Sequence, residues 1–117
     1  MLPDSDLPVL EGFSPYKAVV IAETQASEEW KAKVSRWLVD TGCRYMMAWG
    51  HDCSTWDDSV DVACLEKHDF GDISEEDFVM TTWHDNESLE EVFLFAKTNT
   101  FYMDSPIKNL LFLHIGH

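Results

Sequence analysis

The sequence predicts a small α/β domain, and two observations carry this prediction. Compact runs of apolar and β-branched residues, typical of buried strands, recur at 16–23, 43–49, 78–83 and 110–115. Between these runs, the apolar residues recur with helical spacing. Helical connections of this length favour parallel strands joined by right-handed crossovers. The predicted fold is a three-layer, Rossmann-like or flavodoxin-like α/β/α domain with four mostly parallel strands, in the order β-α-β-α-β-α-β.

The length and the distribution of prolines predict how this domain is organised. A chain of 117 residues suits one domain with a modest core. Residues 1–15 contain three of the four prolines and little periodicity, which predicts an extended N-terminal arm. Residues 16–117 then form the single α/β domain. For its sheet we expect the strand order 2-1-3-4.

Each of the three helices has a recognisable apolar face. In the first, Trp30, Val34, Trp37 and Leu38 recur at helical spacing, and Gly42 marks its end. The other two faces are formed by Val60, Ala63 and Cys64, and by Leu89, Val92, Phe93 and Ala96.

The starts of the second and third helices are predicted from capping residues. Ser54 can cap the second helix, with Asp57 three residues later in a capping-box-like arrangement. Asp85 or Asn86 can cap the third helix.

The negative charge of the chain is concentrated in one region. The formal net charge is −14, and residues 51–91 contain fourteen acids against a single base, Lys67. This segment therefore carries −13, and the rest of the chain sums to −1. Such a field repels nucleic acid and anionic membranes, whose binding requires clustered bases. It suits a basic protein partner, divalent cations, or plain solubility.

The three cysteines and the apolar runs indicate the cellular compartment of the protein. Cys43, Cys53 and Cys64 are odd in number and form no C-x-x-C motif. The sequence begins without the pattern of a signal peptide, and no apolar run is long enough to span a bilayer. These features predict a cytoplasmic protein with free thiols.

Histidines and acids follow the carboxyl ends of the predicted strands, where open parallel sheets bind ligands. Four of the five histidines fall at or near this edge. Imidazole and carboxylate are ligands for divalent metals, and a metal-bound water could attack an ester or phosphoester. Asp and Asn after a strand are also ordinary helix caps, so both interpretations stay open. The candidate metal ligands are Glu23, His51, Asp52, His84 and Asp85.

Two other kinds of site are possible at the same edge. Cys53 precedes a helix, where His51 or His84 could act as its base in nucleophilic catalysis, although nearby acids oppose a thiolate. A phosphate ligand is disfavoured, because none of the strand-to-helix turns contains Lys or Arg and no glycine-rich phosphate motif occurs.

The tryptophans indicate either a binding surface or the top of the core. Trp30 and Trp37 belong to the apolar face of the first helix. The other three could gather above the sheet edge beside acids, which would suit a cation or a protein partner. The surface predicted in this way consists of Trp49, Trp56, Asp57, Asp58 and Trp83.

Two segments also resemble a known group. The stretches "GCRYMMAWGHDCSTWDDSVD" and "FVMTTWHDNESLEEVF" are similar to a group of small bacterial hypothetical proteins without an assigned activity. The resemblance extends from about Tyr16 onward and implies a bacterial cytoplasmic protein of one domain. Receiver and toprim domains fit poorly, because the acid pairs and the late lysine that they need are missing.

The leading functional hypothesis is a non-catalytic acidic interaction module, of an immunity-type or regulatory kind, that binds a basic protein. The alternative is a metal-dependent hydrolase that uses the His/Asp set at the sheet edge. A third possibility is small-molecule binding without chemistry among the tryptophans and acids.

Overall fold

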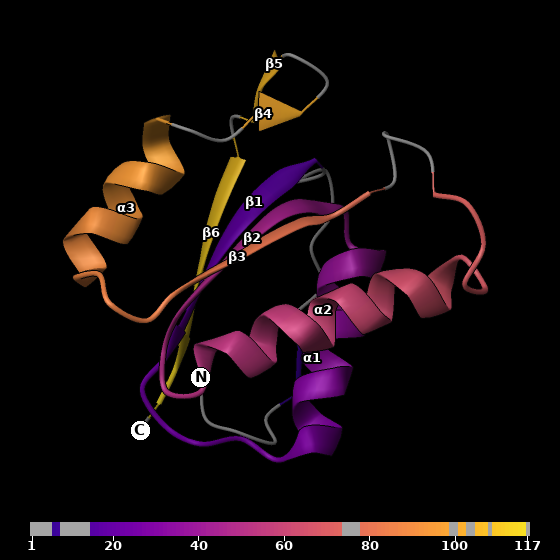
Figure 1. Cartoon of the computed structure of the whole chain (residues 1–117), viewed down its shortest axis with the longest axis horizontal. Coiled ribbons are helices and arrows are strands. Elements are labelled where there is room, and N and C mark those ends of the chain that lie inside the picture. Colours follow the sequence, from indigo (N-terminus) through magenta and orange to yellow (C-terminus); the bar gives the residue numbers. More distant parts are fainter. Residues whose placement is uncertain are drawn as a thin grey trace.

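The computed structural model describes residues 6–7, 15–73, 78–98, 101–102, 105–107 and 109–116. Of the predicted N-terminal arm, most residues lie outside this described part. The elements, shown in Figure 1, are β1 (Tyr16–Ala22), α1 (Glu28–Asp40), β2 (Cys43–Gly50), α2 (Cys53–Lys67), β3 (Met80–His84), α3 (Leu89–Thr98), β4 (Phe101–Tyr102), β5 (Ser105–Pro106) and β6 (Asn109–Ile115).

The four long strands form one parallel sheet, which confirms the predicted fold class. Their order is β3-β2-β1-β6, so the expected order 2-1-3-4 is wrong. The chain steps outward from β1 to β2 and β3 through α1 and α2. It then returns through α3 to the other side of β1. The predicted loop before the last strand also contains a small antiparallel pair, β4 and β5.

The sheet separates two apolar layers, as Figure 1 shows with α1 and α2 on one face and α3 on the other. Successive residues of β1 point to opposite faces, and the strand is buried along its whole length because both faces are covered. Val20 packs in the layer under α1 and α2, together with Leu38 and Met46. Val19 packs in the layer under α3, together with Met47 and Val92.

The helix ends are set by local hydrogen bonds. Ser27 caps α1, because its Oγ accepts a hydrogen bond of 3.2 Å from the backbone N–H of Trp30. Gly42 follows the C-cap Thr41 with a φ of 100°, so the predicted end of this helix is confirmed.

The predicted caps of the other two helices are wrong. Helix α2 begins at Cys53, and its N-cap is Asp52, whose left-handed φ of 53° leaves its side chain without a capping bond. Ser88 lies at the start of α3, where its Oγ accepts a 3.2 Å hydrogen bond from the Glu91 N–H. The residues predicted as caps, Ser54, Asp85 and Asn86, therefore do not begin these helices.

Burial of Cys43 predicts that the protein loses stability at alkaline pH. Cys43 is fully buried, and burial raises the pKa of its thiol from 9.0 to about 12. Because the folded pKa is the higher one, the stabilisation is complete below pH 9 and is lost as the pH rises towards 12. We expect the free energy of unfolding to fall by on the order of 4 kcal/mol over this range. Urea denaturation at a series of pH values measures this fall in the free energy of unfolding.

The variant Cys43→Ala is the control for this effect. Its stability should fall less steeply above pH 9 than that of the wild type. Some dependence remains, since burial also raises the pKa of Tyr16. Identical slopes for the two proteins would show that Cys43 does not carry the effect.

Candidate functional site

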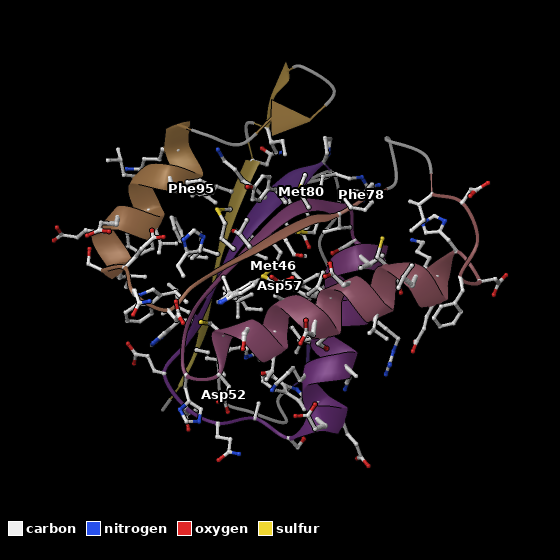
Figure 2. All side chains as sticks on the ribbon, viewed as in Figure 1. Met46, Asp52, Asp57, Phe78, Met80 and Phe95 are labelled. Atoms are coloured by element: carbon white, nitrogen blue, oxygen red, sulfur yellow. The ribbon has the colours of Figure 1, made fainter. Side chains whose placement is uncertain are left out.

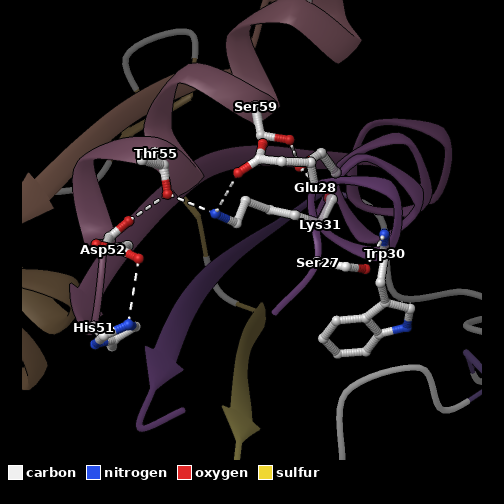
Figure 3. Close-up of polar contacts among 9 residues, drawn as sticks. Ser27, Glu28, Trp30, Lys31, His51, Asp52, Thr55 and Ser59 are labelled. Atoms are coloured by element: carbon white, nitrogen blue, oxygen red, sulfur yellow. Dashed lines mark hydrogen bonds and ion pairs between the residues drawn. The ribbon is translucent and has the colours of Figure 1, made fainter. Parts of the chain in front are cut away.

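The predicted metal ligands follow the carboxyl ends of the strands, but their side chains form separate pairs. Nε2 of His51 lies 3.3 Å from Oδ2 of Asp52, a contact visible in Figure 3. Nδ1 of His84 lies 3.0 Å from Oε1 of Glu87. Each of these histidines is therefore matched with one carboxylate.

The direction of each side chain explains why the set does not converge. His84 is buried on the α3 side of the sheet, where its ring packs against Phe95 with 5.2 Å between centroids. Its Nε2 also lies 2.9 Å from Oγ1 of Thr82. Within the described ranges, no three His, Cys, Asp or Glu side chains come together in a way that could hold a metal ion. His117 lies outside those ranges.

A third His–carboxylate pair occupies the point where the strand connections diverge. Nε2 of His114, near the end of β6, lies 3.0 Å from Oε2 of Glu23, which directly follows β1, and both side chains are about half exposed. Gly116 packs against this pair, because a Cβ built on it would meet both side chains at 3.5 to 3.6 Å. This is the crevice where doubly wound sheets bind ligands. In the described structure it holds one acid–base pair.

The environment of Cys53 opposes nucleophilic catalysis. The side chain is buried, and burial is the largest cause of its raised pKa, to which the charge of Asp85 adds. A hydrogen bond with the backbone of His84 acts in the opposite direction without overcoming the burial. The thiol is thus held neutral, whereas the nucleophile would be the thiolate.

Slow thiol modification is the expected consequence. Cys43, Cys53 and Cys64 are all free and buried. In native protein at pH 7.5 we expect alkylation at least about a hundredfold slower than in urea, where all three should react at the rate of an exposed thiol. Mass spectrometry of timed samples measures it. Fast labelling of native protein that disappears in Cys53→Ser would restore the nucleophile hypothesis.

The three tryptophans expected at the sheet edge do not form one surface. Trp56 is only 1% exposed and meets Trp30 edge to face in the core under α1. Trp49 lies on the α3 side, where its Nε1–H donates to the Glu87 carbonyl at 2.8 Å. Trp83 lies in register with Ala48 of β2, which packs on the α1 and α2 side of the sheet. Trp83 therefore points to the face opposite to Trp49, and it is 52% exposed. The predicted surface therefore loses Trp56, and its other two tryptophans lie on opposite faces.

Asp57 also leaves the predicted surface, because it is 4% exposed beneath α2 (Figure 2). The Thr81 hydroxyl of β3 lies within hydrogen-bonding distance of Asp57 Oδ1 and, at 2.8 Å, of Asp61 Oδ1. That hydroxyl has one hydrogen for two carboxyl groups. Burial, followed by the charge of Asp57, raises the pKa of Asp61. The contacts of Thr81 with Asp57 and Asp61 connect α2 to β3.

A polar seam between α1 and α2 was not predicted. The ammonium of Lys31 is buried and lies 2.7 Å from Oγ1 of Thr55 and 3.5 Å from the carboxylate of Glu28 (Figure 3). One turn further, the hydroxyls of Ser35 and Ser59 are 2.8 Å apart. The signal in the sequence was the i, i+4 pair of Lys31 and Ser35 on an otherwise apolar helix face.

The outer surface of these two helices is hollowed and acidic. A groove of about 360 Å³ runs between α1 and α2, and its charged lining consists of three acids, Glu28, Asp58 and Glu66, and one base, Arg36. Asp58, predicted as a surface residue, is exposed there. Towards β3, α2 also exposes Asp61 and two apolar side chains. We define the α2 face as Asp58, Asp61, Val62, Leu65 and Glu66.

Acidic and apolar side chains alternate on the α2 face. Val62 is 47% exposed and Leu65 is 39% exposed. Lys67, in the last turn of α2, pairs with Asp40 of α1 at 3.3 Å. Among the described residues, no Lys or Arg forms an ion pair with the three acids of the α2 face. None of these three acids is therefore paired with a cation in the described structure, and Asp61 accepts the hydrogen bond from Thr81.

The fold and this surface define a small doubly wound α/β protein with an acidic, partly apolar helix face. All 117 residues match one family, described as a domain of unknown function (DUF7684), and the chain belongs to that family. No curated protein and no solved structure matches the chain. Among the described residues, no helix is long and apolar enough to cross a membrane.

Proposed function

We propose that this protein is a non-catalytic interaction module, of an immunity-type or regulatory kind, whose α2 face binds a basic protein partner. The observation that carries this proposal is the alternation of exposed Val62 and Leu65 with acids that have no cationic partner in the described structure. Apolar side chains supply the surface that is desolvated on binding. The acids around them select a partner of opposite charge.

The charge around this face supports the same choice of partner. The exposed acids described within residues 51–91 are Asp52, Asp58, Asp61, Glu66, Asp69, Asp72, Asp85, Glu87, Glu90 and Glu91. In the same described part the one base, Lys67, is already paired with Asp40. A field of one sign accelerates the encounter with a basic partner and makes it sensitive to salt.

The arrangement of ionisable groups gives catalysis less support. A metal-dependent hydrolase needs about three converging ligands, and the described residues supply separate His–carboxylate pairs. A cysteine nucleophile needs a thiolate, and the pKa of Cys53 is raised. The buried free thiols suit a reducing cytoplasm, which we include in the proposal.

A comparison of two triple variants as baits tests the proposal. The first, Asp58→Asn/Asp61→Asn/Glu66→Gln, removes the acids of the α2 face. The second, Glu29→Gln/Glu90→Gln/Glu91→Gln, removes three exposed acids from α1 and α3 with the same change in net charge. We expect wild type and the second variant to retain a basic partner at 50 mM salt. The first should bind it at least about tenfold more weakly.

The salt dependence and the control decide how the result is interpreted. Retention by wild type should fall steeply by 300 mM salt, because the attraction is screened. Equal losses in the two triple variants would show that net charge, and not the α2 face, governs binding. A partner retained equally by all three proteins would contradict the proposal.

A further inference from the structure

Strand β3 offers a free hydrogen-bonding edge next to the α2 face. It is an outer strand of the sheet, and in the described structure it pairs with β2 alone. Alternate backbone N–H and C=O groups of an outer strand point away from the sheet and can pair with an added strand. Figure 1 shows β3 as one of the two outer strands of the sheet, beside α2.

The side chains along β3 are those of an interface and not of a protected edge. Outer strands are commonly guarded by Lys, Pro or a bulge. Residues 80–84 contain neither Lys nor Pro, and the register with β2 is regular. Met80 is 48% exposed, Trp83 is 52% exposed, and Phe78, just before the strand, is 47% exposed. Figure 2 shows Phe78 and Met80 together at the start of β3.

A recess for a side chain lies at the start of this edge. It measures about 280 Å³ and is lined mainly by apolar groups: Asp61, Cys64, Leu65, Ile73, Phe78 and Val79. Two of these residues, Asp61 and Leu65, belong to the α2 face. A strand added along β3 would pass this recess, because two of the residues that line it are next to β3. Val79 directly precedes the strand, and Asp61 accepts a hydrogen bond from Thr81 of the strand. Pockets beside an open strand give such pairing its sequence preference.

Charge decides which occupant fits this edge. A second copy would bring another net charge of −14 to this edge, including its own Asp61 and Asp85. A basic strand would instead meet these carboxylates with Lys or Arg, while its apolar side chains cover Met80, which lies on the face of the sheet opposite to Trp83. We propose that the partner inserts an extended basic segment that adds a strand to the sheet along β3. This inference rests on the proposed function and specifies how the partner binds.

Three synthetic peptides of equal charge test the mode of binding. The first alternates lysine and valine over ten residues. The second has the same sequence, with backbone N-methyl groups on alternate residues that block one hydrogen-bonding edge. The third is a basic amphipathic helix. We expect only the first to bind wild type at 50 mM salt and to protect the amides of residues 80–84 from hydrogen exchange. N-methylation should weaken binding at least about tenfold.

A matched pair of variants locates the site. Met80→Lys places a positive charge on the edge, and Leu94→Lys places the same charge on an exposed apolar position of α3. The first substitution should abolish peptide binding, while the second should leave it unchanged. Sedimentation of the free protein completes the test. We expect wild type to show no dimer that forms through β3 and is abolished by Met80→Lys.

The outcomes separate this inference from the proposed function. If all three peptides bind alike, or if none protects residues 80–84, the strand-addition inference is wrong. The proposed function would still stand if the α2-face variant loses its partner in the bait comparison. A wild-type dimer that Met80→Lys abolishes would overturn the inference by assigning the edge to a second copy.

Discussion

Gly50→Ala is expected to destabilise the protein by on the order of 4 kcal/mol, which is a large part of the stability of a small domain. Gly50 ends β2 with a φ of 101°, a conformation that alanine rarely adopts. A Cβ at this position would overlap the carbonyl oxygen of Ala22 and lie 3.0 Å from its carbonyl carbon. That carbonyl also accepts a 2.6 Å hydrogen bond from the His51 N–H, so neither β1 nor β2 can move away freely.

Gly116→Ala is the control for the effect of the added methyl group. Its Cβ would meet its nearest neighbours at ordinary van der Waals distances of 3.5 to 3.6 Å. We expect a change below about 1 kcal/mol there. Urea denaturation of both variants measures the difference. Equal stabilities would mean that β1 and β2 do not approach each other closely at Gly50.

Trp56→Ala is expected to cost about 4 kcal/mol of stability, the usual range for removing a large buried aromatic side chain. Trp56 is 1% exposed and lies edge to face against Trp30, with 6.4 Å between the ring centroids. The ammonium of Lys31 lies 5.7 Å from the ring centroid. The substitution would therefore leave a cavity where α1 and α2 pack together, beneath a buried charge.

Trp83→Ala makes the same chemical change at a half-exposed position. Because Trp83 is 52% exposed, we expect a loss of about 1 kcal/mol or less. Denaturation curves followed by circular dichroism compare the two variants without relying on tryptophan fluorescence. If Trp83→Ala proved the more damaging change, Trp56 would not belong to the core.

The fold class could be predicted from the sequence because it depends on local patterns. Apolar runs and helical spacing specify the elements, and the length of each connection implies parallel strands. Strand order depends instead on which face each helix covers, a long-range choice. Here α1 and α2 share one face, so β3 lies outside β2, and α3 covers the other face and returns the chain to β1.

The candidate site was predicted less well because position along a strand does not give side-chain direction. His51 follows β2 and His84 is the last residue of β3, so both do lie at the carboxyl ends of neighbouring strands. Yet His84 turns towards α3 and pairs with Glu87, while His51 pairs with its neighbour Asp52, the N-cap residue of α2. A shift of one residue along a strand sends a side chain to the opposite face. Trp49 and Trp83 are separated for that reason.

The acidic surface that we propose for partner binding could be anticipated only in outline. The concentration of acids in residues 51–91 was plain from the sequence, but Asp57 is buried against Thr81 and does not contribute to the surface. The exposed Val62 and Leu65 could not be recognised as surface groups, because apolar residues in a helix usually indicate its buried face. That β3 lies at an edge of the sheet could be recognised only from the strand order.

The bait comparison tests the central claim most directly. A basic partner retained by wild type at 50 mM salt should be lost from Asp58→Asn/Asp61→Asn/Glu66→Gln and kept by Glu29→Gln/Glu90→Gln/Glu91→Gln. Both variants should first be shown to unfold at the same urea concentration as wild type. Equal retention by the two triple variants at 50 mM salt would contradict the assignment of partner binding to the α2 face.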